Sequence, residues 1–291
     1  MTDLDGRTGL AVSPLPSGFA PLLFAGRLEE GVRIAAELGF AAVELSLRAP
    51  DDVDPGALAS MLQDNGLVLS AIATGQACLV DSLCLGSADA EDRKAAEDRI
   101  LGAVELAAPF DAAVIVGGIR GRLAGSPAQQ RSLRAGALDA IRRCARRASQ
   151  VGVTVLLEPI NRYETNFVNT AAEGLAVLEE LGEPSMKLLL DTFHMNIEER
   201  TFADALCTAG DRLGYVHVAD SNRRAPGQGH IDFAEVMGTL DAIAYRGMLV
   251  AEVLPLPDDL GAARLTAAFW AQVAARGPEE ISGSRRPEGA P

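Results

Sequence analysis

The sequence predicts an α/β protein built as a single (β/α)8 TIM barrel, and three observations support this fold. Short apolar, β-branched runs alternate with longer stretches of helical periodicity, which is typical of βα units on a parallel sheet. Eight such runs follow one another at a spacing of roughly 30 residues, enough for one closed barrel. The 291 residues contain no Pro/Gly/Ser-rich linker between units, so we expect one barrel domain over 1–276 and not a doubly wound sheet.

The expected elements follow in chain order. The strand candidates are GLAVSP (9–14), AAVELSL (41–47), LVLSAIA (67–73), AAVIVG (112–117), VTVLLE (153–158), MKLLLD (186–191), GYVHVA (214–219) and MLVAEV (248–253). Helical periodicity between them predicts helices that include 27–38, 91–108, 127–150 and 260–275. Residues 277–291 are polar and rich in Gly and Pro, so we expect a disordered tail there.

Composition and charge narrow the class of protein. The chain is 48% apolar and 23% charged, as in soluble globular enzymes, and its net charge of −14 would repel a nucleic acid. It lacks a signal-peptide pattern and an apolar stretch of about 18 residues, so we expect a cytoplasmic protein without a membrane partner. The four cysteines, at positions 78, 84, 144 and 207, have no CxxC spacing, so we expect reduced thiols.

Metal-ligand residues end four of the last strand candidates: Glu158, Asp191, His217 and Glu252. They are about one βα unit apart, so in a barrel they converge at the C-terminal mouth. Clustered carboxylates repel one another unless a cation lies between them. Three oxygens and one imidazole suit Mn²⁺, Mg²⁺ or Co²⁺, and the geometry could admit Zn²⁺. Taken alone, each carboxylate is better explained as a partner in an ion pair or as a helix cap, and His217 could be a hydrogen-bonded core histidine. Taken together, at the ends of consecutive strands, the four residues favour a metal site.

Neighbouring polar residues are candidates for substrate binding. His194 follows Asp191 by three residues and could donate to a substrate oxygen, although it could also be a histidine at a helix N-terminus. Arg223, on the loop after the seventh strand, could hold a guanidinium over the pocket. Arg224 is nearly as good a candidate from spacing alone. For His230, structural and functional roles are evenly balanced.

Two further loops carry alternatives. In VGGIRGRLAG (116–125), Arg120 and Arg122 could bind an anionic substrate group, but a flexible surface loop is the simpler interpretation. The segment ATGQACLVDSLCLG (73–86) is unusually apolar for a loop. It could form a lid or pocket wall, and core packing explains it equally well.

The motifs EPINRYETNFVNT, LDTFHMNIEE and SNRRAPGQGH resemble the xylose-isomerase-like sugar phosphate isomerase/epimerase superfamily, and within it the ketose 3-epimerases of the D-tagatose and D-psicose type. The resemblance spans residues 8–275. ATGQA, GGIRGR, HVADSNR and EVLPLP are more similar to the 5-keto-L-gluconate epimerases, which makes Arg120 and Arg122 candidates for binding a substrate carboxylate.

The resemblance implies one divalent ion, commonly Mn²⁺, held by the four ligand residues. It implies that Glu158 and Glu252 act as acid and base, that Glu164 joins His194 and Arg223 in binding substrate oxygens, and that the chain forms a homodimer or homotetramer.

The expected function is therefore epimerisation of a keto-sugar or keto-sugar acid of the 5-keto-L-gluconate/D-tagaturonate type. Two Glu residues would abstract and return a proton next to a carbonyl, through a metal-bound cis-enediolate. The nearest alternative is an aldose/ketose isomerase of the hydroxypyruvate type or a ketose 3-epimerase. A metal-dependent phosphodiester hydrolase needs more histidines and a basic face. A non-catalytic sugar-binding barrel leaves the paired Glu residues without a purpose.

Overall fold

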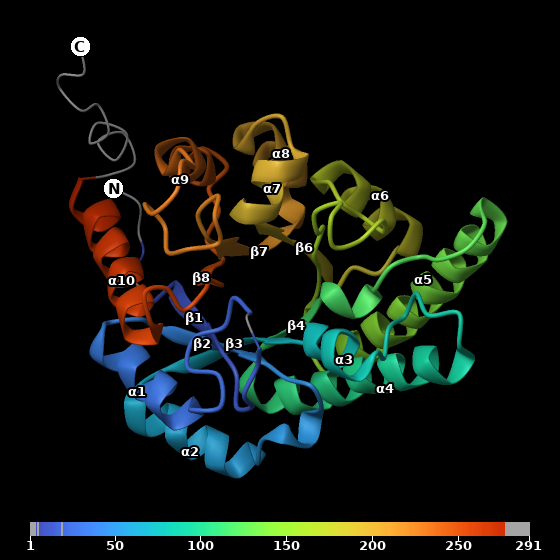
Figure 1. Cartoon of the computed structure of the whole chain (residues 1–291), viewed down its shortest axis with the longest axis horizontal. Coiled ribbons are helices and arrows are strands. Elements are labelled where there is room, and N and C mark those ends of the chain that lie inside the picture. Colours follow the sequence, from blue (N-terminus) through green and yellow to red (C-terminus); the bar gives the residue numbers. More distant parts are fainter. Residues whose placement is uncertain (1–3, 5, 19, 277–291) are drawn as a thin grey trace.

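The computed structural model describes residues 4, 6–18 and 20–276, so the expected tail at 277–291 lies outside the described residues. Within that range eight parallel strands close into a barrel, each paired with the next in chain order, and β8 pairs back to β1 (Figure 1). The predicted (β/α)8 barrel is confirmed. The strands are β1 (Thr8–Val12), β2 (Ala42–Ser46), β3 (Val68–Ala73), β4 (Ala113–Val116), β5 (Val155–Leu157), β6 (Met186–Asp191), β7 (Leu213–Val218) and β8 (Met248–Ala251).

Helices surround the strands on the outside of the barrel (Figure 1). The α-helices are α1 (Leu28–Glu37), α2 (Pro55–Asn65), α3 (Gly75–Asp81), α4 (Ala90–Ala107), α5 (Pro127–Gln150), α6 (Ala171–Leu181), α7 (Thr192–Glu198), α8 (Phe202–Ala209), α9 (Phe233–Ala242) and α10 (Asp259–Arg276). Short 3₁₀ turns are η1 (Pro50–Asp52), η2 (Ala108–Phe110), η3 (Gly118–Arg120) and η4 (Gly210–Arg212). Helix α5 has its predicted bounds, and α1, α4 and α10 differ from theirs by one residue at each end.

Local sequence explains where several of these helices begin. Ser126 accepts from the backbone N–H of Gln129, whose side chain reaches back to Ser126, and Pro127 occupies the first helical position of α5. This capping box satisfies backbone N–H groups that have no partner inside the helix. Thr170 caps α6 in a similar way through the N–H of Glu173.

The buried side chains form two layers. The larger layer lies between the strands and the surrounding helices, and the smaller one fills the barrel interior with Ala11, Leu22, Ala71, Ile115, Leu156, Leu189, Tyr215 and Val250. Small residues on β1 and β3 leave room inside the barrel, where Glu44 and His217 are also buried. The C-terminal ends of all strands meet at one rim, which is where residues that end strands come together. Among the described residues, none of the helices is both long and apolar enough to cross a bilayer.

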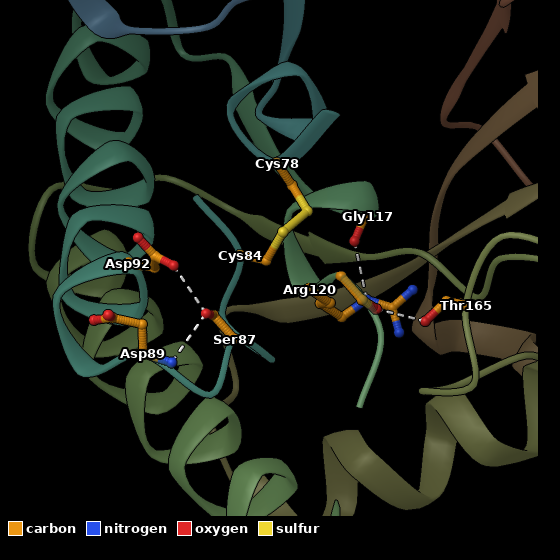
Figure 2. Close-up of a disulfide and its surroundings, with 9 residues drawn as sticks. Cys78, Cys84, Ser87, Asp89, Asp92, Gly117, Arg120 and Thr165 are labelled. Carbon is orange, nitrogen blue, oxygen red and sulfur yellow. Dashed lines mark hydrogen bonds between the residues drawn. A yellow bond between two sulfur atoms is a disulfide. The ribbon is translucent and has the colours of Figure 1, made fainter. Parts of the chain in front are cut away.

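The expectation of reduced thiols is wrong for Cys78 and Cys84, which form a disulfide (Figure 2). Cys78 lies on α3, and Ser82 ends that helix in a left-handed conformation (φ 60°), which turns the chain so that Cys84 reaches back. Their Cα atoms lie 4.8 Å apart, within the range that a disulfide spans. The spacing of the cysteines and the length of the chain, on which the expectation of reduced thiols rested, give no information about a turn of so few residues. Cys144, which is buried, and Cys207, which is exposed, are free.

Candidate metal centre and active site

Four consecutive strands bring the predicted metal ligands to one point of the rim. Glu158 directly follows β5, Asp191 is the last residue of β6, His217 is the last but one of β7, and Glu252 directly follows β8. One ligand atom of each residue lies within 4.8 Å of the ligand atoms of the other three. The structure therefore brings together all four residues that the sequence places at the ends of separate strands.

The imidazole of His217 is oriented so that one nitrogen faces this cluster. Its Nε2 lies 2.8 Å from Oε2 of Glu44, while its Nδ1 lies 3.4 Å from Glu252 Oε2, 3.7 Å from Glu158 Oε1 and 3.8 Å from Asp191 Oδ2. Within the described part of the chain, this buried Nδ1 has no hydrogen-bond partner. Because buried polar atoms are nearly always paired, an unpaired nitrogen facing three carboxylates fits a cation ligand.

The charge balance of the cluster also fits a cation. Arg223 donates hydrogen bonds to Asp191 and to Glu252. Its single positive charge does not balance the three ligand carboxylates and the carboxylate of Glu44, which contacts His217. Burial alone would raise the pKa of Glu252, but Arg223 and His217 lower it to about 2. Burial would likewise lower the pKa of Arg223, but its carboxylate partners raise it above its ordinary value. The excess negative charge and the O₃N donor set suit a hard or borderline divalent ion.

A cavity of about 370 Å³ opens beside this cluster. Its lining includes Glu158, His217 and Glu252 and all three residues expected to bind substrate oxygens: Glu164, His194 and Arg223. Nε2 of His194 lies 3.9 Å from Glu158 Oε1 and 4.0 Å from Asp191 Oδ2, so this histidine faces the ligand cluster. His194 also lies near the start of helix α7. Its position therefore agrees with both interpretations from the sequence, a histidine at a helix N-terminus and a residue that faces the substrate.

Asn161 links two of these residues and was not singled out from the sequence. Its Nδ2 donates to Oε1 of Glu164 at 2.7 Å and lies 2.9 Å from Nδ1 of His194. If Nδ1 accepts, the proton of a neutral imidazole is on Nε2, the nitrogen that faces the cluster. Asn161 is itself buried, so it holds both side chains from below the cavity surface. Its position in EPINRYET, three residues after Glu158, is the only sequence signal for it.

Arg120 and Arg122 are not among the residues that line the cavity. The buried guanidinium of Arg120 donates to the backbone carbonyls of Gly117, Glu158 and Phe167, so its hydrogen bonds hold loops together. Burial lowers the pKa of Arg120 to about 10, and Glu158 partly offsets this. Arg122 is exposed at its hydrogen bond to the Tyr163 carbonyl. Carboxylate binding by Arg120 and Arg122 stays a prediction from the sequence, and the observed contacts of both side chains are to backbone carbonyls.

The other two alternatives also lie outside the cavity lining. Arg224 is exposed on the loop beyond Arg223. The exposed His230 places Nδ1 2.9 Å from Oγ of Ser221, within its own loop. Both side chains therefore lie on the exposed part of the loop after β7.

The apolar segment 73–86 forms one wall of the cavity. Ala77 of α3 and Leu85 after it are buried in the core, whereas Leu79 and Val80 are exposed and line the cavity, so both sequence interpretations of this segment hold for different residues. The disulfide ties α3 to the stretch that follows it (Figure 2). The N–H groups of Leu85 and Gly86 donate to the backbone carbonyls of Ile119 and Arg120 in the η3 loop. The wall is thereby fastened to the loop after β4.

Gly117 on that loop allows Glu158 to take its position. A Cβ atom at residue 117 would lie 2.0 Å from Glu158 Oε2, closer than any side chain could tolerate. The backbone of the β4 loop therefore packs directly under the carboxylate.

Glu44, which contacts the proposed ligand His217, was also not singled out from the sequence. It lies in the middle of β2 with 0% exposure, in AAVELSL, where a charged residue interrupts an otherwise apolar run. That interruption was the available signal.

Comparison with known proteins places this site in a family. The family described as "Xylose isomerase-like TIM barrel" matches residues 32–270. The chain is 37% identical to an L-ribulose 3-epimerase of Methylomonas sp. over 75% of each chain, and 36% identical to a ketose 3-epimerase of Arthrobacter globiformis over 79% of this chain and 81% of that one. The crystal structure of a D-allulose 3-epimerase from Methylomonas sp. in complex with D-allulose superposes with a TM-score of 0.78 at 28% identity, covering 91% of this chain and 96% of that one. As the sequence motifs predicted, the chain belongs to the xylose isomerase-like TIM barrel family.

Proposed function

We propose that this chain is a divalent-metal-dependent epimerase of a keto-sugar, which removes a proton from the carbon next to a carbonyl and returns one to the opposite face. The observation that carries the proposal is the convergence of Glu158 and Glu252 with Asp191 and His217 within 4.8 Å. β5 and β8 stand three strands apart in the barrel, so their two carboxylates can reach a substrate from different sides. The relatives named above are 3-epimerases, which supports inversion at carbon 3.

The four ligand residues would hold the ion, with Mn²⁺ as our first choice and Mg²⁺, Co²⁺ or Zn²⁺ as alternatives. A divalent ion at this point polarises a substrate carbonyl and makes the neighbouring C–H group more acidic. One carboxylate, of Glu158 or Glu252, then takes the proton, and the other, protonated, supplies one from the far side. In the reverse direction the two residues exchange roles.

The remaining polar residues of the cavity would bind and orient the substrate. With Asn161 as donor to Nδ1, His194 presents an N–H at Nε2 to the substrate oxygen on which negative charge grows. Arg223 can donate to the same oxygen or its neighbour, and Glu164 can accept from a hydroxyl group.

A neutral ketose is the substrate class that the cavity favours over a keto-sugar acid. Among the described residues of its lining, Arg223 is the one Lys or Arg side chain, and it is already paired with two carboxylates. Arg120 is committed to backbone carbonyls and Arg122 lies outside the cavity lining, so neither supports the expected carboxylate site for 5-keto-L-gluconate or D-tagaturonate. The ketose 3-epimerase alternative therefore moves ahead of the keto-acid one.

Isotope exchange followed by NMR tests this proposal. Chelator-treated protein, with and without added Mn²⁺, is incubated in D₂O with L-ribulose, D-fructose, D-tagatose, 5-keto-L-gluconate, D-tagaturonate and hydroxypyruvate. We expect Mn²⁺-dependent deuterium at carbon 3 and the 3-epimer of a neutral ketose. An aldose labelled on the neighbouring carbon would identify an isomerase instead, and no exchange with any compound would refute the proposal. That the chain forms a homodimer or homotetramer stays a prediction, which light scattering would test.

A further inference from the structure

We propose that Glu44 is a positioning residue for the metal centre, which holds His217 in the tautomer and orientation that present Nδ1 to the ion. The inference rests on the proposed metal site and names a residue that contributes no ligand atom. Glu44 accepts the hydrogen bond of the Nε2–H group, and Nδ1 is thereby left with a free lone pair.

The contact crosses the barrel interior. Glu44 is on β2 and His217 on β7, and β7 pairs with β6 and β8, so no backbone ladder brings the two residues together. They are 173 residues apart in the sequence, yet Oε2 of Glu44 lies 2.8 Å from Nε2 of His217. Both are almost fully buried, with 0% and 1% exposure. An interior hydrogen bond of this length, between side chains that water cannot reach, fixes the ring direction.

Of the groups around the imidazole of His217, Glu44 is the one that determines which ring nitrogen carries the proton. The ring of Tyr215 packs edge-on against the ring of His217, with centroids 5.6 Å apart, and limits its tilt. The Tyr215 hydroxyl is 2.7 Å from Oγ of Ser70, which in turn donates to the Val43 carbonyl. The other three groups around Nδ1 are the ligand carboxylates themselves. Tyr215 therefore shapes the ring pocket, and Glu44 is the acceptor at Nε2.

A positioning role predicts a loss of metal affinity that a purely structural ion pair does not. Removing a carboxylate that orients a histidine ligand commonly weakens metal binding by roughly 10- to 100-fold. Mn²⁺ dissociation constants, measured by electron paramagnetic resonance, are compared for the wild-type protein, Glu44→Ala, Glu44→Gln and Glu97→Ala. We expect Glu44→Ala to weaken binding by roughly 10- to 100-fold, and Glu44→Gln, whose amide oxygen still accepts from Nε2–H, to recover most of it. Glu97→Ala, which removes another buried carboxylate that pairs with Arg143 away from the ligand cluster, is the matched control and should bind Mn²⁺ like the wild type.

A second comparison shows whether Glu44 acts through His217. In a His217→Ala background, Glu44→Ala should cause no further loss of Mn²⁺ affinity, because the group that it orients is gone. An equal loss in both backgrounds would show a general electrostatic effect and would overturn the proposal.

The wild-type protein alone provides a third readout, independent of how the variants fold. The chain has three histidines, so ¹⁵N-histidine labelling gives a simple spectrum, recorded with diamagnetic Zn²⁺. We expect one ring with a protonated Nε2 and a metal-bound Nδ1. The reverse tautomer, or unchanged affinity in Glu44→Ala, overturns the positioning role. Failure of the wild-type protein to bind any of the ions would instead overturn the proposed function.

Discussion

Arg223 donates a hydrogen bond from its guanidinium to the carboxylate of Glu252, so a fixed positive charge lies within the proposed ligand cluster. The same side chain donates to Asp191. Its backbone is in the left-handed region (φ 62°), and its guanidinium lies 4.8 Å from the centre of the Phe193 ring. An arginine held so firmly against two ligands competes with a cation for the same oxygens.

We therefore predict that Arg223→Met strengthens Mn²⁺ binding while it weakens turnover. Loss of the competing charge should raise Mn²⁺ affinity by about 10-fold, and loss of a donor to the substrate oxygen should lower kcat/KM by about 100-fold or more. Arg224→Met, at the exposed neighbouring position, should change neither quantity. Calorimetric titration and steady-state kinetics measure the two effects, and weaker Mn²⁺ binding in Arg223→Met would show that the arginine organises the ligands instead.

Glu158→Gln and Glu252→Gln should each lower epimerisation by about 10²- to 10⁴-fold at saturating Mn²⁺, because each removes one of the two proton carriers. Deuterium exchange in D₂O, followed separately from each of the two epimers, measures proton removal by the residue that remains. Exchange from one epimer without inversion would identify that residue. Full exchange from both epimers in both variants would contradict the assignment.

Arg120 and Arg122 should differ sharply in their effect on stability. Arg120→Met removes the guanidinium that donates to the backbone carbonyls of Phe167 and Glu158 and leaves Gly117 only the backbone N–H of residue 120, which should cost about 3 kcal/mol of unfolding free energy. Arg122→Met removes an exposed contact and should cost less than about 0.5 kcal/mol. Denaturant unfolding measures both. A raised KM for a keto-acid in Arg122→Met, with stability unchanged, would restore the carboxylate-binding role expected from the sequence.

The four cysteines should react in a fixed order with iodoacetamide at pH 8. Burial raises the pKa of Cys144 to about 12, so its thiolate, the reacting form, becomes abundant only as the pH approaches that value. Intact mass should therefore show one adduct on the native protein, at Cys207, and a second, at Cys144, after unfolding. Cys78 and Cys84 should react only after reduction. Three adducts on the native, unreduced protein would show that this pair is not bonded.

Leu79 should affect substrate binding without affecting the metal. It is 81% exposed on α3 and lines the cavity, so a substrate that covers it gains apolar contact. Leu79→Ser should raise KM by roughly 5- to 30-fold, the equivalent of about 1–2 kcal/mol of lost burial. Val68→Ser is the matched control, because Val68 is also exposed (54%) but is not part of the cavity lining. Equal effects of the two changes would show that α3 is not a substrate wall.

Sequence reasoning succeeded where a pattern was local and repeated. The strands could be predicted because apolar runs recur at the spacing of βα units, and the ligand residues because an acid or imidazole ends each of four runs. For β6, even the bounds at Met186 and Asp191 agree. The geometry of the cluster then follows from the barrel itself.

Contacts that depend on the path of the chain could not be predicted. The direction of Arg120 depends on the turn at η3 and on Gly121, whose φ is 65°. The pairing of Cys78 with Cys84 depends on the left-handed residue Ser82. Both conformations are decided by packing against other loops, and single-residue patterns carry little information on that.

The four proposed ligands all come from the second half of the barrel, from β5 to β8, whereas α3 and the segment around Leu22 that complete the cavity come from the first half. Apart from Glu44, which contacts His217, and Gly117, which packs under Glu158, cavity residues of the first half can therefore be exchanged without touching the proposed ligands. The same barrel can therefore keep its reaction centre unchanged while substitutions in the first half alter which sugar the cavity accepts.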